Sequence, residues 1–118
     1  GDRTAQADVT APEVVSTSPE ANDTGVNKAK GLNIDFVMSE DILPDTVIKA
    51  NTLIAKTADQ EVFKDYGVSY ISATKTIRLT TTEALAASTE YVVVLGMGIK
   101  DLNGNSLEPF VLKFTTGA

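Results

Sequence analysis

Near its C-terminus the chain reads Ile99-Lys100-Asp101-Leu102-Asn103-Gly104-Asn105-Ser106-Leu107, and Phe110-Val111-Leu112-Lys113-Phe114 follows shortly afterwards. Asn103-Gly104 favours a tight turn, because both residues adopt the positive φ angles of a type I′ turn at little cost. Residues 91–95 and 110–114, on either side, are rich in β-branched and aromatic side chains, which is typical of strands. We therefore predict two strands that fold back on each other. They are joined either at a two-residue turn or through a longer loop that includes Pro109.

Length and composition indicate one globular domain. A chain of 118 residues is long enough for a single hydrophobic core, and its 42% hydrophobic and 22% charged residues are near the averages for globular domains. Residues 1–11 are small and polar, so we predict a linker or cloning remnant there and one domain at residues 12–118. No apolar run approaches the ~20 residues of a membrane helix, so we predict no membrane insertion.

Charge and residue types exclude several classes of function. The chain has 10 Lys and Arg against 16 Asp and Glu, a formal net charge of −6. Its basic residues are scattered, so we predict no nucleic-acid partner. Cysteine is absent, which excludes disulfides, thiolate metal sites and thiol nucleophiles. Histidine is absent as well, which excludes a Ser-His-Asp triad, and we predict that the domain is not an enzyme.

Short strand-like runs separated by turn signals cover most of the chain. The predicted strands are residues 13–18, 32–39, 52–56, 67–72, 76–81, 91–97 and 110–114. Two prolines, Pro12 and Pro19, bracket the first run and place it at a sheet edge. Residues 83–88 are too short for an independent helix, and we predict a corner with Leu85 pointing inward. In residues 91–97 both faces are apolar, with Met97 on the face of Tyr91, so this strand should be central. The pattern predicts an antiparallel Greek-key β-sandwich of about seven strands.

Several pieces of the sequence together resemble the bacterial Ig-like domains found in surface-layer and other exported bacterial proteins. The similarity covers about residues 12–116. Its parts are Ser18-Pro19, Gly25-Val26, Leu32 with Ile34 and Phe36, Ser39-Glu40, Leu85, Thr89-Glu90-Tyr91, Lys100-Asp101-Leu102-Asn103-Gly104-Asn105 and Phe114-Thr115-Thr116.

The resemblance implies an Ig-like sandwich that serves as a structural or adhesive module. It implies an extracellular or cell-surface location, with neighbouring domains of the same chain or a cell-surface assembly as partners. Tyr91 resembles the corner tyrosine of Ig-type sandwiches. Antibody domains have a cysteine pair and a tryptophan that this chain lacks. The core is therefore expected to rest on Leu32, Ile34, Phe36, Ile77, Leu79, Tyr91, Val93, Leu112 and Phe114.

Asp101, Asn103 and Asn105 are candidate metal ligands. Their side-chain oxygens alternate along the chain, as they do in calcium loops. An EF-hand loop starting at Asp101 would need glycine at its sixth position and glutamate at its twelfth, but Gly104 is fourth and Leu112 is twelfth. The same residue types are those that a tight turn requires. We expect a plain turn and no cofactor, with calcium as the alternative, helped by Glu40, Asp41 or Glu108.

Three further patterns have competing interpretations. Gly96-Met97-Gly98 lacks the third glycine and the helix of a phosphate loop, and it fits a bulge or close backbone approach better. Glu40 and Asp41 could pair as catalytic carboxylates, but a solvated loop start is the simpler interpretation. Aromatic residues could provide a glycan-binding face, which makes glycan the alternative partner. The candidates for that face are Phe63, Tyr66, Tyr70 and Phe110.

Overall fold

The structure is a computed structural model, and it describes residues 10–118. The linker predicted at residues 1–11 therefore lies almost wholly outside the described residues. The strands are β1 (Val14–Ser18), β2 (Asn33–Met38), β3 (Thr52–Lys56), β4 (Tyr66–Ile71), β5 (Thr76–Thr81), β6 (Glu90–Leu95) and β7 (Phe110–Thr115). Three short 3-10 turns lie between them: η1 (Pro44–Thr46), η2 (Lys49–Asn51) and η3 (Ser72–Thr74).

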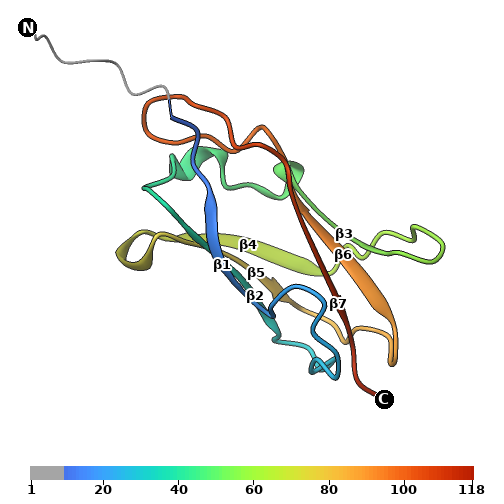
Figure 1. Cartoon of the computed structure of the whole chain (residues 1–118). Helices are drawn as coiled ribbons and strands as arrows, with labels where there is room; N and C mark the ends of the chain where they lie inside the picture. Colours follow the sequence, from blue (N-terminus) through green and yellow to red (C-terminus); the bar gives the residue numbers. More distant parts are fainter. Residues whose placement is uncertain (1–9) are drawn as a thin grey trace, which may run out of the picture.

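The strands form two antiparallel sheets (Figure 1). A four-stranded sheet has the order β1-β2-β5-β4, and a three-stranded sheet has the order β3-β6-β7. Lettered from A to G along the chain, these orders are A-B-E-D and C-F-G, the arrangement of a constant-type Ig sandwich. The predicted fold class is confirmed, and so are the edge position of β1 and the central position of β6.

Alternation along the strands builds the core between the sheets. In the four-stranded sheet, Ile34 pairs with Leu79 and Phe36 with Ile77, and all four side chains are fully buried. In the three-stranded sheet, Tyr91 pairs with Phe114 and Val93 with Leu112. The predicted core residues are buried, except that Leu32 is half-buried and packs against the core. Leu85 points inward as predicted.

A second part of the core lies under loops at one end of the sandwich. Four apolar side chains from the loops after β2 and β6 are buried there: Ile42, Val47, Ile99 and Leu107. They belong to the same cluster of buried residues as the strand core. The expected core omits them, because loop residues show no strand period.

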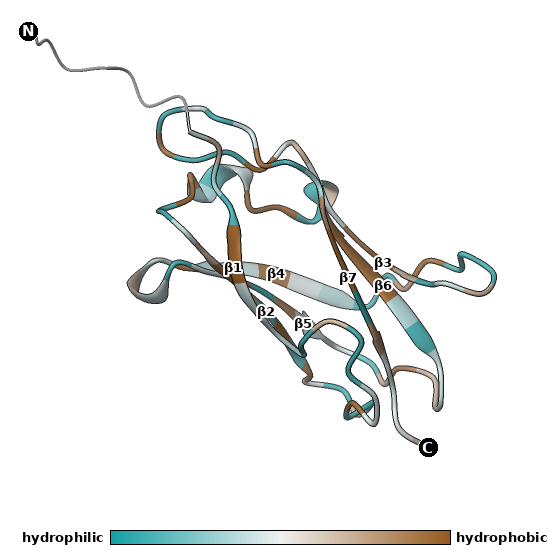
Figure 2. Cartoon of the chain, in the orientation of Figure 1, coloured by the Kyte–Doolittle hydropathy of each residue, from teal (hydrophilic) through white to brown (hydrophobic). Residues whose placement is uncertain are grey.

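The end of β6 corrects one expectation. The strand stops at Leu95, and Met97 is 65% exposed, so it does not share the buried face of Tyr91. The expectation of apolar side chains on both faces is confirmed. Val94 lies between Leu53 and Val111 in register on the outer face. Figure 2 shows β6 as hydrophobic over much of its length, with a hydrophilic lower end.

The predicted hairpin between β6 and β7 forms through the longer of the two connections. Asn103-Gly104 does not join the two strands directly. It closes a smaller hairpin inside the connection. In this hairpin Leu107 N–H donates to Ile99 O over 2.8 Å, and Lys100 and Ser106 form an isolated antiparallel β-bridge. Gly104 has a φ of 85°, the positive value that the turn needs. We call residues 99–107 the inner hairpin.

Candidate functional site

Asp101 is the polar centre of the inner hairpin. Its side chain is fully buried, although the residues around it are typical of an exposed turn. One carboxylate oxygen, Oδ1, accepts hydrogen bonds from the backbone N–H groups of Asn103 (2.9 Å) and Asn105 (2.8 Å). The other oxygen, Oδ2, accepts from Asn105 Nδ2 over 3.0 Å. The carboxylate thus holds the turn closed from inside.

Two opposing effects act on the pKa of Asp101. Burial raises it, because the charged form loses its hydration. The hydrogen bonds from Asn105 and Asn103, with a further side-chain hydrogen bond that involves Glu40, favour the charged form. The hydrogen bonds together outweigh burial, and the pKa of Asp101 lies below its ordinary value of 3.8. Asp101 is therefore a carboxylate at neutral pH.

The structure brings the three candidate metal ligands together in the inner hairpin. Asn105 presents its amide nitrogen, a donor, to Asp101, and the N–H of Asn103 points to the same carboxylate. Within residues 10–118 no group of three or more His, Cys, Asp or Glu side chains could hold a metal ion. Calcium binding by Asp101, Asn103 and Asn105 stays a prediction.

The inner hairpin is fastened to the loop that follows β2. Ile42 forms an isolated bridge with Asp101, and Leu43 N–H donates to Lys100 O over 2.8 Å. Thr46 Oγ1 accepts from Lys100 N–H over 3.0 Å. These bonds join two long connections into one cap, which covers the loop-end part of the core.

Gly96 and Gly98 allow a close approach at the edge of this cap, as predicted. Gly96 N–H donates to Asn51 O over 2.8 Å. A β-carbon at Gly98 would lie 2.2 Å from Asn51 Oδ1, which is too close for two non-bonded atoms. Asn51 is itself held by a hydrogen bond from its Nδ2 to Thr46 O. Gly96 therefore makes room for the backbone of Asn51, and Gly98 makes room for its side chain.

The opposite end of the sandwich is closed by hydroxyl groups. Tyr91 is 1% exposed, and its hydroxyl accepts a hydrogen bond from Ala86 N–H over 2.9 Å. This confirms Tyr91 as the corner tyrosine. Thr116 Oγ1 donates to Ala86 O (2.6 Å) and accepts from Thr89 N–H (2.9 Å). Together Tyr91 and Thr116 fix the crossing at residues 82–89.

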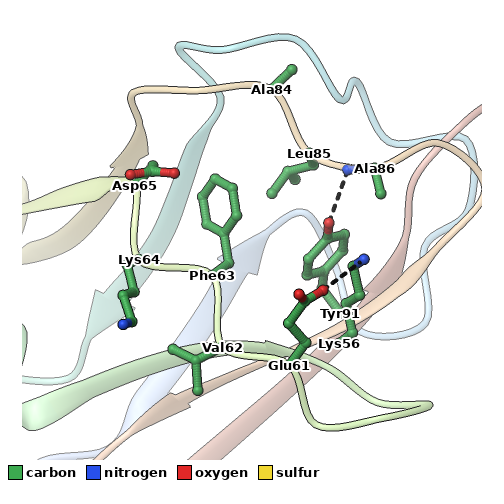
Figure 3. A pocket seen from close by; sticks show the side chains of 10 residues that line it. All are labelled: Lys56, Glu61, Val62, Phe63, Lys64, Asp65, Ala84, Leu85, Ala86 and Tyr91. Atoms are coloured by element: carbon green, nitrogen blue, oxygen red, sulfur yellow. Dashed lines mark hydrogen bonds and ion pairs between the residues drawn. The ribbon is translucent and has the colours of Figure 1, made fainter.

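A cleft of ≈ 480 Å³ opens beside this crossing (Figure 3). Phe63, Leu85 and Tyr91 provide its apolar side chains. Its rim is charged: Lys56 and Glu61 form an ion pair over 3.0 Å, and Lys64 and Asp65 line the same cleft. Phe63 packs edge-on against Tyr91, with ring centroids 6.3 Å apart.

The four aromatic residues considered for a glycan face do not share one surface. Phe63 alone lines this cleft. Tyr66 is buried and bonded to Thr52 Oγ1, and Phe110 packs edge-on against Phe36. Tyr70 uses its hydroxyl to bond Asp41 and Ile42 N–H. An aromatic platform is therefore not formed.

The side chains of Glu40 and Asp41 form hydrogen bonds with different residues. Asp41 is exposed and accepts a hydrogen bond from the hydroxyl of Tyr70 over 2.9 Å. Glu40 contributes instead to the hydrogen bonding around Asp101. The two carboxylates do not face a common substrate position.

The sheet order, the corner tyrosine and the core define an Ig-like β-sandwich. The chain belongs to the bacterial Ig-like domain family, whose model matches residues 8–116. No curated protein sequence matches the chain. Within residues 10–118 the structure contains no helix that is both long and apolar enough to cross a membrane.

Solved structures share the fold at low sequence identity. The N-terminal part of the bacterial S-layer protein SbsC superposes with a TM-score of 0.69 and 19% identity, over 92% of this chain and 24% of that chain. For SbsC residues 31–844, the chain spans 14% of the length. CopC from Methylosinus trichosporium OB3b superposes with a TM-score of 0.70 and 18% identity, over 90% of this chain and 93% of that chain. PcoC, a methionine-rich copper resistance protein from Escherichia coli, superposes with a TM-score of 0.71 and 19% identity, over 91% of this chain and 99% of that chain.

Proposed function

We propose that this domain is a non-enzymatic structural module of an exported bacterial cell-surface protein, where it spaces or supports neighbouring domains. One observation carries the proposal: the described chain begins at one end of the sandwich and finishes at the opposite end (Figure 1). A module of this form adds its own length between whatever precedes and follows it.

Both ends of the described chain are attached to the sandwich. Thr10, Ala11 and Pro12 line a hollow together with Leu107 and Phe110, beside the inner hairpin. At the far end, Lys28 Nζ donates to Ala118 O over 2.9 Å, and Gly117 N–H donates to Val26 O. Attachment at both ends means that the domain itself fixes where the described chain enters and leaves the sandwich, which suits a spacer.

Three polar side chains that are buried have structural roles, which supports a non-enzymatic function. The carboxylate of Asp101 and the hydroxyls of Tyr91 and Thr116 all bond to backbone groups of the domain itself. PcoC is a copper resistance protein, but the residue types of this chain do not favour copper binding. Copper favours imidazole, thiolate and thioether ligands, and this chain offers only two methionines, of which Met38 is in the core.

Glycan binding is the second candidate, and the cleft at Phe63 is the observation in its favour. Phe63 is half-buried, so part of its ring is open to a ligand, and the charged rim offers hydrogen-bond partners. A glycan array probed with the domain and with a Phe63→Ala variant tests it. Binding that the variant loses supports the glycan function, and no binding to any glycan rejects it.

Exchange of the module within its parent protein tests the spacer function. Residues 10–118 are replaced either by an unrelated Ig-like sandwich or by a flexible Gly/Ser linker with the same number of residues. A spacer predicts that the unrelated sandwich preserves the parent's display and adhesion, whereas the flexible linker does not. If the unrelated sandwich fails as completely as the linker, the domain has a specific function and the proposal is wrong.

A further inference from the structure

The four sheet edges of the sandwich differ in how they are shielded. Unpaired N–H and C=O groups along an edge strand can pair with another chain, and proteins usually protect them. The β1 edge is bracketed by Pro12 and Pro19. It is also interrupted at Val15, where the pairing register with β2 shifts. Prolines and bulges are common means of blocking strand addition.

The two edges of the three-stranded sheet are covered by the chain itself. Beside β3, Lys56 N–H donates to Glu61 O over 2.9 Å and Phe63 N–H donates to Ile54 O over 2.8 Å. Beside β7, Asn22 N–H donates to Lys113 O, and Thr115 N–H donates to Asp23 O, each over 2.8 Å. These two edges have no long run of unpaired backbone left.

The β4 edge is the exception. Thr82 N–H donates to Asp65 O, so the odd-numbered residues of β4 pair with β5. The backbone groups of Val68 and Tyr70, and the carbonyl of Tyr66, therefore point away from β5. Residues 67–71 make no backbone hydrogen bond outside the β4–β5 ladder within residues 10–118. This edge is open over most of its length.

The strand at the open edge has no charged residue of its own, although Lys49 Nζ lies 4.6 Å from the ring centre of Tyr66 and Asp41 bonds the hydroxyl of Tyr70. No charged residue occurs in residues 66–74, although the chain as a whole carries −6. In Figure 2, β4 is drawn in pale colours and brown, without the strong teal of charged side chains. Gly67 and Ser69, both small and exposed, form its solvent-facing side. Residues 66–74 therefore lack charged side chains of their own, which commonly prevent edge pairing.

We propose that the β4 edge pairs with the β4 edge of a second copy of this chain. Because the unpaired groups lie on even-numbered residues, an antiparallel register centred on Val68 pairs Val68 with Val68 and Tyr66 with Tyr70 of the second copy. In that register Lys64 faces Ser72 and Asp65 faces Ile71, so no like charges oppose each other. The edge is thus self-complementary in its backbone hydrogen bonds, and the paired residues contain no like-charge clash. The product is a continuous antiparallel sheet of eight strands across a twofold axis.

A six-residue edge is a small contact, and we expect weak, concentration-dependent dimers. Sedimentation velocity from about 10 µM to about 1 mM measures them. NMR over the same series should show concentration-dependent shifts at the amides of Val68 and Tyr70. A chain that stays monomeric to the highest concentration overturns the proposal, as do shifts confined to other edges.

Substitutions at Gly67 give a matched test. A β-carbon at Gly67 meets no atom within 4 Å and its φ is not positive, so side chains are tolerated there. In the proposed register Gly67 faces Ser69 of the second copy, and the two Gly67 positions lie diagonally across the twofold axis. Gly67→Ala should leave association unchanged, and Gly67→Lys should weaken it about 5-fold by like-charge repulsion between the two diagonal lysines. A mixture of Gly67→Lys and Gly67→Glu should restore association. Equal behaviour of the Ala and Lys variants contradicts pairing at this edge.

A proline at the centre of the edge tests the hydrogen bonds themselves. Val68→Pro removes an outward N–H without removing a bond to β5, so the monomer should fold and dimerisation should be lost. Dimerisation that survives in a folded Val68→Pro variant overturns the proposal. If the Val68→Pro variant does not fold, the Gly67 variants decide whether the β4 edges pair.

Discussion

At one end of the sandwich the hydroxyls of Tyr91 and Thr116 hold the crossing at residues 82–89, whereas at the other end the carboxylate of Asp101 holds the inner hairpin. At both ends these side chains accept hydrogen bonds from backbone N–H groups that have no partner in a neighbouring strand. They differ in chemical kind: one end uses hydroxyl groups, and the other uses the carboxylate of Asp101. The two ends should therefore respond differently to mutation and to acid.

The largest effect is expected at Asp101. Asp101→Ala leaves the N–H groups of Asn103 and Asn105 without their buried acceptor, which should lower the free energy of unfolding by about 3 kcal/mol. Urea denaturation measures the change. Asp45→Ala, an exposed carboxylate in the same cap, is the control and should change stability by about 0.5 kcal/mol or less. Equal effects of the two substitutions would show that Asp101 does not hold the hairpin.

The next effect is expected at Gly98, where the cap packs against η2. Gly98→Ala places a methyl group against the Asn51 side chain, and overpacking of this kind should cost about 2 kcal/mol. The double variant Asn51→Ala/Gly98→Ala removes the clash, so the two substitutions should be less than additive in urea denaturation. Simple additivity would contradict the contact.

A smaller effect is expected at the hydroxyl end. Tyr91→Phe keeps the ring and removes only the acceptor for Ala86 N–H, which should cost about 1 kcal/mol. Hydrogen exchange should also become faster at the Ala86 amide. An unchanged exchange rate would show that the hydroxyl does not fix the crossing.

The smallest loss of stability is expected for the ion pair between Arg78 and Asp35, on the outer face of the four-stranded sheet. Arg78 Nε and Nη2 donate to the two carboxylate oxygens of Asp35 over 2.8 and 2.9 Å, and this ion pair raises the pKa of Arg78. Both side chains are partly exposed, so solvent screens the pair. Arg78→Met should change the urea midpoint least of the four substitutions, and by less still at high salt. A change as large as that of Asp101→Ala would contradict this ranking.

The alternation of apolar residues and the positions of prolines and turn residues predict most of the strands from the sequence. Alternation identifies the faces of β2 and β5, two prolines place β1 at an edge, and Tyr91 is identified by family resemblance. These features depend on local sequence, so they can be recognised without the fold. Thr116 is part of the family resemblance, but its role cannot be predicted from the sequence, because its two hydrogen bonds reach residues about 30 positions away in the chain.

The inner hairpin is where sequence reasoning was least complete. Asn103-Gly104 predicts a turn correctly, but not that the turn lies within a longer connection. Asp101 in a polar turn is expected to be exposed, because ionised side chains are rarely buried without partners. The available signal was the pair of apolar residues, Ile99 and Leu107, that flank the turn symmetrically and bury it.

The dependence of stability on pH tests the central difference between the two ends most directly. Because the pKa of Asp101 is below 3.8 in the folded domain, its stabilisation is fully present above that pH and is lost as the pH falls through the folded value. The measurement is the difference in unfolding free energy between the wild-type domain and Asp101→Asn, at about pH 7 and about pH 2. The Tyr91→Phe difference serves as the reference, because this substitution removes a hydroxyl and no carboxylate. We predict that the Asp101→Asn difference shrinks at about pH 2 while the Tyr91→Phe difference stays constant. An Asp101→Asn difference that is the same at both pH values would contradict an ionised carboxylate at the loop end.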